Sequence, residues 1–279
     1  MEVTSVAESV EMRTAVRETY GPADLSSVPV FAGGFINFGY WRSVDLAGPV
    51  SVDDRVRSQQ DLYRHVLDSL GPLTGRRLLE VGCGLGVGCA LALREYDPAH
   101  LTGMDIHPQQ LDRAHRANAA LLDASPPRLR FVRGAAEDMP FADAEFDRVH
   151  SVEAAQHFDD LAAFARETAR VLAPGGRVAV TSFFTPDDDP RHAARLAELL
   201  QTYADGLDVA RSVTDLAEAF TRAGLTDART ASIGPEVWEG WDRWLSDQWE
   251  PGTWPRNFLK AYREGALDYY VVTATRPGP

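Results

Sequence analysis

Apolar runs and amphipathic segments alternate regularly between about residue 77 and residue 185. The runs "RRLLEV" and "HLTGMDI" have the length of buried strands, and the segments after them, "VGCALALREY" and "PQQLDRAHRANAALL", have helical spacing. "RLRFVRG" and "EFDRVHSV" predict two more strands, "DDLAAFARETARVL" predicts a helix, and the apolar "VAVTSFF" predicts a strand buried on both faces. Strands that alternate with helices favour right-handed βαβ units and a mostly parallel sheet, which is an α/β fold.

The pattern is less regular on both sides of this region. Before it, the sequence predicts a helical entry, a Gly/Pro-rich segment that contains "FAGGFINFGYW", and a helix over about 53–70. After it come helices over about 190–204 and 213–223, a weak strand near 227–233 and a tryptophan-rich helical stretch. "DYYVVTATRP" near the end predicts the last strand. We expect these outer parts to cover the carboxyl edge of the sheet.

The chain is acidic, with 28 Lys and Arg against 41 Asp and Glu in 279 residues and a net charge of −13. Its arginines are scattered, so the sequence has no basic stripe that would follow a nucleic-acid backbone. No apolar run approaches the roughly 20 residues that span a bilayer, and the first residues lack a signal-peptide core. We expect no disulfide between Cys83 and Cys89, a cytoplasmic protein, and neither a nucleic-acid nor a membrane partner.

A glycine-rich turn, "LLEVGCGLG", follows the first strand of the alternating region. Gly82, Gly84 and Gly86 carry no side chains, so the backbone of this turn can approach a ligand closely. Asp105 ends the next strand, nineteen residues after Gly86, where a carboxylate can accept both hydroxyls of a ribose. Together these residues predict a nucleoside-containing cofactor.

Two classes of cofactor compete for this turn. A nicotinamide site usually opens with G-x-G-x-x-G near the start of its domain and places a pyrophosphate at a helix N-terminus. Here the glycines are spaced by two, Glu80 ends the preceding strand, and about 80 residues come before the turn. A carboxylate at this place suits a cationic ligand and repels a pyrophosphate, which disfavours a nicotinamide oxidoreductase.

Four motifs together resemble those of the class I S-adenosylmethionine-dependent methyltransferases of the small-molecule, natural-product type. They are "LLEVGCGLG", "GMDIHP", "GAAEDMPF" and "ARVLAPGGRVAV", and the resemblance covers about residues 55–185 well and the final strand moderately. It implies a Rossmann-like, mostly parallel sheet of seven strands with the last strand antiparallel, plus a helical lid. It also implies S-adenosylmethionine as the cofactor and S-adenosylhomocysteine as its product.

The resemblance further implies one methyltransferase domain over residues 1–279. Its parts would be an N-terminal helical lid (1–70), a cofactor-binding core (71–185) and a C-terminal part with helical insertions and the last strands (186–279). In the core, the residues implied to contact the cofactor are Glu80, Gly82 and Gly84 at the methionine part, Asp105 at the ribose, Ile106, Ala136 and Glu137 at the adenine, and Ser151 at the end of the fourth strand.

The segment "FINFGYW" resembles the "HxGYW" stretch that closes over the cofactor in small-molecule methyltransferases. On this interpretation Asn37 and Tyr40 reach the amino-acid end of the cofactor. The alternative is a hydrophobic plug made of Phe35, Phe38 and Trp41.

The stretch "SVEAAQHF" (151–158) lies where the fourth strand ends, beside the expected methyl donor. Relatives that methylate natural-product hydroxyls often carry "E-S-x-x-H" or "H-H" here, and the second histidine position matches His157. An imidazole with a pKa near 6.5 is suited to taking a proton from a hydroxyl, which makes His157 the candidate base. Glu153 would orient His157 or contact the cofactor. The alternatives are that His157 positions the substrate, or that it only packs or caps the next helix.

Candidate substrate contacts come from three places in the sequence. Phe183 and Phe184 end the fifth strand, at the edge where open α/β sheets bind ligands. The tryptophan-rich stretch predicts a stripe that belongs either to the core or to the wall of a bulky apolar site. The residues predicted to contact the substrate are Phe35, Gln156, Phe183, Phe184 and Trp241.

The function that these features predict is methyl transfer to a small molecule of secondary metabolism, with O-methylation favoured over N- or C-methylation. The alternatives are a cyclisation or decarboxylation on the same scaffold, and a non-catalytic binding module. The acidic run in "PDDDPRH" is expected to be a solvated loop, so no metal is predicted. A homodimer is a further expectation for a lidded protein of this family.

Overall fold

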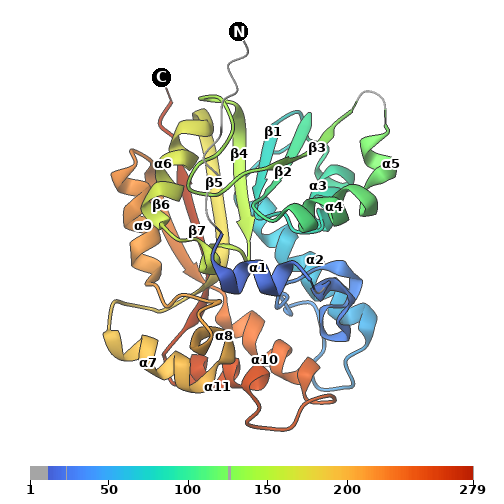
Figure 1. Cartoon of the computed structure of the whole chain (residues 1–279), viewed down its shortest axis with the longest axis vertical. Helices are drawn as coiled ribbons and strands as arrows, with labels where there is room; N and C mark the ends of the chain where they lie inside the picture. Colours follow the sequence, from blue (N-terminus) through green and yellow to red (C-terminus); the bar gives the residue numbers. More distant parts are fainter. Residues whose placement is uncertain (1–11, 23, 125–126, 279) are drawn as a thin grey trace.

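The computed structural model describes residues 12–22, 24–124 and 127–278 (Figure 1). The strands are β1 (Arg77–Val81), β2 (His100–Asp105), β3 (Leu129–Arg133), β4 (Phe146–Val152), β5 (Leu172–Phe184), β6 (Thr226–Ser232) and β7 (Asp268–Thr275). The α-helices are α1 (Thr14–Tyr20), α2 (Val52–Ser69), α3 (Val87–Tyr96), α4 (Pro108–Ala117), α5 (Ala119–Leu122), α6 (Leu161–Val171), α7 (Pro190–Leu199), α8 (Gln201–Ala204), α9 (Val213–Arg222), α10 (Gly234–Leu245) and α11 (Asn257–Arg263). Short 3₁₀ turns are η1 (Leu25–Ser27), η2 (Pro29–Gly34), η3 (Ala155–His157) and η4 (Trp254–Arg256).

The seven strands form one sheet in the order β3-β2-β1-β4-β5-β7-β6. Neighbouring strands from β3 to β5 are parallel, and β7 runs antiparallel to both β5 and β6. The predicted Rossmann-like, seven-stranded sheet with an antiparallel last strand is therefore confirmed. β1 and β4 are neighbours although β2 and β3 lie between them in sequence, so the strand order reverses beside β1, where open α/β sheets bind ligands.

Helices cover both faces of the sheet and its carboxyl edge. α2 and α3 pack on one face, while α6 and α9 pack on the other. A third group of helices, α7, α8, α10 and α11, lies beyond the carboxyl edge, and α1 crosses between this group and the sheet (Figure 1). No helix of the described segments is long and apolar enough to cross a membrane.

The structure differs from the sequence prediction in two local features. The helix expected after β2 is interrupted at Asn118, whose side-chain amide donates to the carbonyls of Leu85 and Ala114. This amide thereby ties the end of α4 to the glycine-rich turn. The turn expected before the fifth strand is part of β5, because Leu172 already pairs with Phe146, and a register shift accommodates the extra residues.

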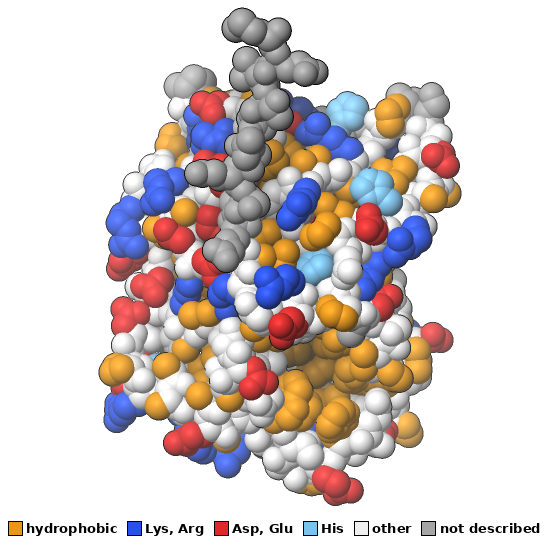
Figure 2. Space-filling view, viewed as in Figure 1, with side chains coloured by type: hydrophobic (Ala, Val, Ile, Leu, Met, Phe, Trp, Pro, Cys, Tyr) orange, Lys and Arg blue, Asp and Glu red, His pale blue; other side chains and the backbone are white. Residues whose placement is uncertain are grey.

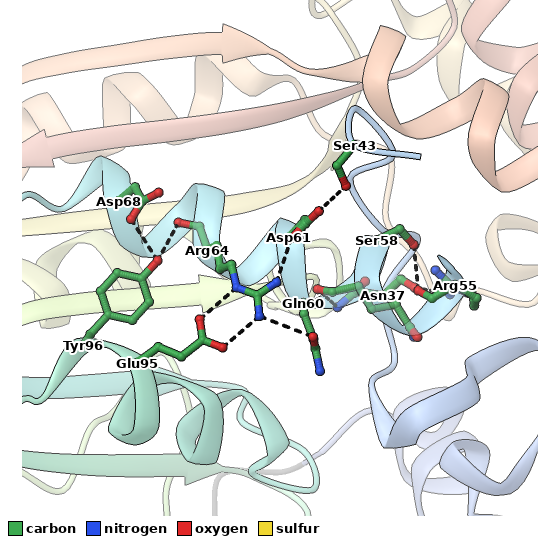
Figure 3. Close-up of polar contacts among 11 residues, drawn as sticks. Asn37, Ser43, Arg55, Ser58, Gln60, Asp61, Arg64, Asp68, Glu95 and Tyr96 are labelled. Atoms are coloured by element: carbon green, nitrogen blue, oxygen red, sulfur yellow. Dashed lines mark hydrogen bonds and ion pairs between the residues drawn. The ribbon is translucent and has the colours of Figure 1, made fainter. Parts of the chain in front are cut away.

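Helix α2 is held by polar contacts along its exposed side (Figure 3). Arg64 donates to Asp61 on its own helix and to both carboxylate oxygens of Glu95 on α3. The hydroxyl of Tyr96, also on α3, donates to Asp68. At its other end α2 carries Arg55, which is fully buried and donates to the carbonyl of Asn37. These contacts place the 35–41 segment relative to the sheet.

Helix α10 packs closely on the 35–41 segment, so adding a methyl group at this contact should destabilise the protein. A Cβ atom built on Gly240 would lie 2.0 Å from Cγ of Trp41, whose ring is buried. We expect Gly240→Ala to lower the free energy of unfolding by about 1–3 kcal/mol, because α10 must move away from the indole. Urea denaturation measures the loss, and Gly48→Ala is the control, since nothing lies within 4 Å of a Cβ there. Equal midpoints for both variants would contradict this packing.

Candidate active site

Two cavities meet at the carboxyl edge of the sheet. The inner cavity, of about 130 Å³, lies at the ends of β1, β2 and β4. The outer cavity, of about 710 Å³, lies between α1, η2 and the helices beyond the sheet, and its walls are mainly apolar. Figure 2 shows a hollow bordered by hydrophobic side chains on this face of the molecule. Among the described residues, four line both cavities: Tyr20, Ile36, Glu153 and His157.

The glycine-rich turn forms part of the inner cavity. Gly82, Gly84 and Gly86 have φ of 77°, 51° and 67°, a region that favours glycine. A Cβ on Gly82 would lie 2.4 Å from Cβ of Ala154, whereas nothing lies within 4 Å of a Cβ on Gly84. The backbone at Gly84 therefore borders open space, which suits the close approach of a ligand.

Asp105 lies at the end of β2 and also lines the inner cavity. Its Oδ2 accepts from the Gly84 amide at 2.9 Å and its Oδ1 accepts from the His107 amide at 2.8 Å. Burial raises the pKa of Asp105, while the two amides act in the opposite direction. A carboxylate has about four acceptor sites, so two remain for hydroxyl groups of a ligand.

The residues predicted to lie against an adenine ring also surround the inner cavity. Ile106, Ala136 and Glu137 are all part of its wall. One carboxylate oxygen of Glu137 accepts from the Asp159 amide at 2.8 Å, which fixes the position of this side chain. The residues present thus fit a nucleoside: apolar contacts and one carboxylate at one end, and Asp105 at the ribose position.

Glu80 and Ser151 do not line either cavity. The Glu80 carboxylate is fully buried and accepts from the Tyr63 hydroxyl and the Cys89 thiol, both at 2.9 Å. Tyr63 lines the inner cavity in its place. The Ser151 hydroxyl donates to the carbonyl of Val81 at 2.8 Å. Both side chains point into the sheet and its packed helices, so the contact of Glu80 and Ser151 with a cofactor stays a prediction.

The lid segment also departs from its predicted contacts. The Asn37 side chain lies against α2 and accepts from the Gly39 amide, and Tyr40 stacks on His65 with 4.6 Å between ring centroids. Phe35 is buried beside Tyr63. None of these three predicted residues lines a cavity, because α2 takes up their side chains. Ile36, which was not predicted as a contact, and Phe38, which was predicted only as part of a hydrophobic plug, do line cavities.

His157 lies at the junction of the two cavities and is held by hydrogen bonds on both ring nitrogens. Its Nδ1 is 3.1 Å from the carbonyl of Leu207 and 3.3 Å from Oδ1 of Asp208. Its Nε2 is 2.8 Å from the Tyr20 hydroxyl and 3.2 Å from Nε2 of Gln156. Burial lowers the pKa of His157, and the Asp208 carboxylate partly opposes this effect.

The surrounding groups determine which nitrogen carries the proton. Nδ1 faces only acceptors, so it carries hydrogen. Nε2 faces the amide nitrogen of Gln156, a donor whose orientation follows from Oε1 accepting from the Ser182 hydroxyl at 2.5 Å. The Tyr20 hydroxyl beside it can donate to an unprotonated Nε2. The lone pair of Nε2 therefore points toward the cavity junction. A neutral imidazole in this tautomer is a proton acceptor at that place.

Glu153 directly follows β4 and has an unusual backbone conformation, with φ of 52°. Its Oε2 accepts from the Tyr269 hydroxyl at 2.5 Å and from the Phe38 amide at 2.8 Å. Burial raises the pKa of Glu153 to about 7, while these two donors lower it. Glu153 therefore joins β4, β7 and the lid segment at the junction, rather than pairing with the imidazole of His157.

The outer cavity contains three of the five predicted substrate contacts. Gln156, Phe183 and Trp241 line it, and the Trp241 indole also donates to the carbonyl of Pro255. Phe184 lies on the opposite face of β5, in the core beneath α6 and α9, because successive side chains of a strand point to opposite faces. Phe184 therefore does not reach the outer cavity, and its contact with a substrate stays a prediction.

Two residues that contact the ring of His157 were not expected from the sequence. Asp208 lies in the loop after α8, and Tyr20 is the last residue of α1. Neither belongs to a recognisable local motif, so an alignment of related sequences would be needed to identify them as candidate site residues. Arg13 lies behind them and donates to the carbonyls of His157 and Leu207. Within the described segments, no group of three or more His, Cys, Asp or Glu side chains is placed to hold a metal ion.

Comparisons with known proteins agree with this arrangement. Residues 79–180 match the family described as "Methyltransferase domain". The fatty-acid O-methyltransferase of Mycolicibacterium smegmatis is 31% identical over 87% of this chain and 83% of its own length. The erythromycin 3''-O-methyltransferase of Saccharopolyspora erythraea is 28% identical over 88% of this chain and 85% of its own length.

Among solved structures, geranyl diphosphate C-methyltransferase from Streptomyces coelicolor A3(2) has the same fold. Its TM-score is 0.77 at 19% identity, with 94% of this chain and 96% of the other covered. The sheet, the glycine-rich turn, the family match and a full-length relative above 30% identity all agree. The chain belongs to the class I S-adenosylmethionine-dependent methyltransferases.

Proposed function

We propose that this enzyme methylates a hydroxyl group of a bulky, largely apolar small molecule of the secondary-metabolite kind. The observation that carries the proposal is the position of His157. Its unprotonated Nε2 lies at the junction of the inner cavity, whose wall contains Asp105 and the glycine-rich turn, and the large apolar outer cavity. A base at this point can reach an acceptor on one side and the methyl donor on the other.

The inner cavity is the proposed cofactor site. Asp105 would hold the ribose hydroxyls, Gly82 and Gly84 would border the methionine part, and the wall that contains Ile106, Ala136 and Glu137 would border the adenine. The cofactor supplies an electrophilic methyl group on a sulfonium. The inner wall contains the carboxylates of Asp105, Glu137 and Glu153 and, among its described residues, no Lys or Arg, which suits a positively charged ligand.

The proposed proton path uses only residues of the junction. The acceptor hydroxyl would take the place at Nε2 that the Tyr20 hydroxyl now occupies. As the oxygen becomes an ether, its proton passes to Nε2, and the resulting imidazolium is stabilised by Asp208 at Nδ1. His157 is then the catalytic residue, while Gln156 and Asp208 position its ring.

Size and chemistry of the outer cavity support a bulky acceptor. A volume of about 710 Å³ lies within the usual range for sites that enclose small-molecule ligands. The names of the two relatives support oxygen as the acceptor atom, whereas the structural neighbour is named as a C-methyltransferase. The histidine base favours oxygen, because methyl transfer to a hydroxyl requires removal of a proton.

Incubation with S-adenosylmethionine and a panel of hydroxylated compounds tests the proposal. The panel contains macrolides, polyphenols, long-chain alcohols and fatty acids, and mass spectrometry follows S-adenosylhomocysteine and the methylated product. We expect both products in equal amounts with at least one bulky member of the panel. A converted acceptor without S-adenosylhomocysteine would overturn methyl transfer in favour of a cyclisation or decarboxylation.

A further inference from the structure

The charged side chains of Asp, Glu, Lys and Arg type that line the outer cavity are all negative among its described residues. Its wall contains four carboxylates, and none of its described residues is Lys or Arg. The four are Glu18, Glu153, Asp205 and Asp208. This feature is separate from the histidine base and concerns which molecule the cavity admits.

The four carboxylates fall into two pairs with different surroundings. At the inner end Glu153 is partly buried and accepts from the Tyr269 hydroxyl, and Asp208 is buried beside His157. Glu18 on α1 and Asp205 after α8 are exposed to solvent. Asp205 accepts only from the Gln201 amide at 2.7 Å, and neither carboxylate forms an ion pair within the described segments. The outer pair is therefore free to meet a charge on a ligand.

Arg13, which lies beside the loop that carries Asp205, is already engaged. Arg13 donates to the carbonyl of Gly206, next to Asp205, but its Nε pairs with Asp159 at 2.7 Å. Its guanidinium also donates to the carbonyls of His157 and Leu207. Arg13 does not line the cavity, so it leaves the negative charge of the wall facing the interior.

Aromatic rings supply a second, independent preference for a cation. Among the described residues, eight Phe, Tyr and Trp rings line the outer cavity: Tyr20, Phe31, Phe38, Phe183, Trp241, Trp249, Trp254 and Phe258. Trp249 and Trp254 are each 41% exposed, so their rings lie where the cavity opens to solvent. The face of an indole attracts an ammonium group and repels an anion.

We infer that the acceptor is an amphiphile with an apolar body and a protonated amine, and that the amine binds near Glu18 and Asp205 at the aromatic mouth. The inference rests on the proposed function, because it assigns the outer cavity to the acceptor. An anionic head group would find no positive partner in this wall and would lose hydration on entry. The cavity therefore selects against carboxylates and phosphates.

Binding of three probes with the same alkyl chain tests the inference without methyl transfer. Decylamine, decanol and decanoate are titrated into the protein saturated with S-adenosylhomocysteine, below their aggregation concentrations and at pH 7.5. The amine is then protonated, as a lysine side chain would be. We expect decylamine to bind roughly tenfold more tightly than decanol, with decanoate weakest, and the advantage of the amine to shrink in high salt.

Matched variants assign the preference to the outer carboxylates. The double variant Glu18→Gln/Asp205→Asn should bring decylamine to the affinity of decanol and leave decanol unchanged. Asp215→Asn, on α9 and outside both cavities, is the control and should keep the preference. Decanoate binding as tightly as decylamine, or a preference that persists in the double variant, would overturn the inference. If the amine preference fails but the protein methylates an anionic acceptor, the inference is wrong and the proposed function stands. If the amine preference holds but no acceptor is methylated, the proposed function is wrong and the amine preference stands.

Discussion

His157→Ala should lower the rate of methyl transfer about 10²–10⁴-fold while leaving the affinity for S-adenosylhomocysteine nearly unchanged. The variant removes the group whose Nε2 accepts the proton, but it removes none of the contacts made by Asp105 or the glycine-rich turn. Single-turnover kinetics gives the rate, and calorimetric titration gives the affinity. His100→Ala, which removes an exposed imidazole outside both cavities, is the control.

The pH dependence separates catalysis from a purely structural role. His157 acts as a base only when it is neutral, and burial lowers its pKa, so activity should rise with pH through a value below 6.5 and then stay level. Asp208→Asn removes the charge that opposes this shift, so the rising limb should move to still lower pH as the rate falls. Glu153 has a pKa of about 7, and a limb near 7 that disappears in Glu153→Gln would belong to Glu153 instead.

A His157→Ala variant that keeps its full rate would eliminate His157 as the base. An equal loss of rate and of S-adenosylhomocysteine affinity would mean that the imidazole holds the junction together. A pH profile that is the same in Asp208→Asn and in the unaltered enzyme would exclude Asp208 as the positioning group.

Asp105→Ala should weaken binding of S-adenosylhomocysteine by at least about 100-fold. Hydrogen bonds from neutral donors to a carboxylate contribute about 1.5–3 kcal/mol each, and the variant would lose those to the ribose. It also leaves the Gly84 and His107 amides without their acceptor, which loosens the turn. Calorimetric titration measures the change, and Asp123→Ala, an exposed carboxylate at the end of α5, is the control.

NADH provides the second arm of this experiment. The unaltered protein should bind S-adenosylhomocysteine and not NADH, because the inner wall is negatively charged. Unchanged affinity for S-adenosylhomocysteine in Asp105→Ala would show that the ribose lies elsewhere in the cavity.

Local sequence patterns were sufficient for the features that depend on the backbone. Alternating strands and helices predicted the sheet, and the spacing of Gly82 and Gly84 with Asp105 predicted the inner wall, because turns and strand ends follow from neighbouring residues. The directions of the side chains in the lid segment could not be predicted from the sequence pattern. Asn37 and Tyr40 turn toward α2, and this depends on packing between segments that the sequence pattern does not describe.

The sequence by itself thus determined the fold class, the family and the edge of the sheet where ligands bind. Only the tertiary structure brought Tyr20, His157 and Asp208 together, although they come from α1, η3 and the loop after α8. It also decided that Phe183 faces the outer cavity while Phe184 faces the core. The physical reason is that a strand or turn is specified by interactions between near neighbours, whereas the tautomer of His157 and the charge of the outer cavity arise from groups far apart in the chain.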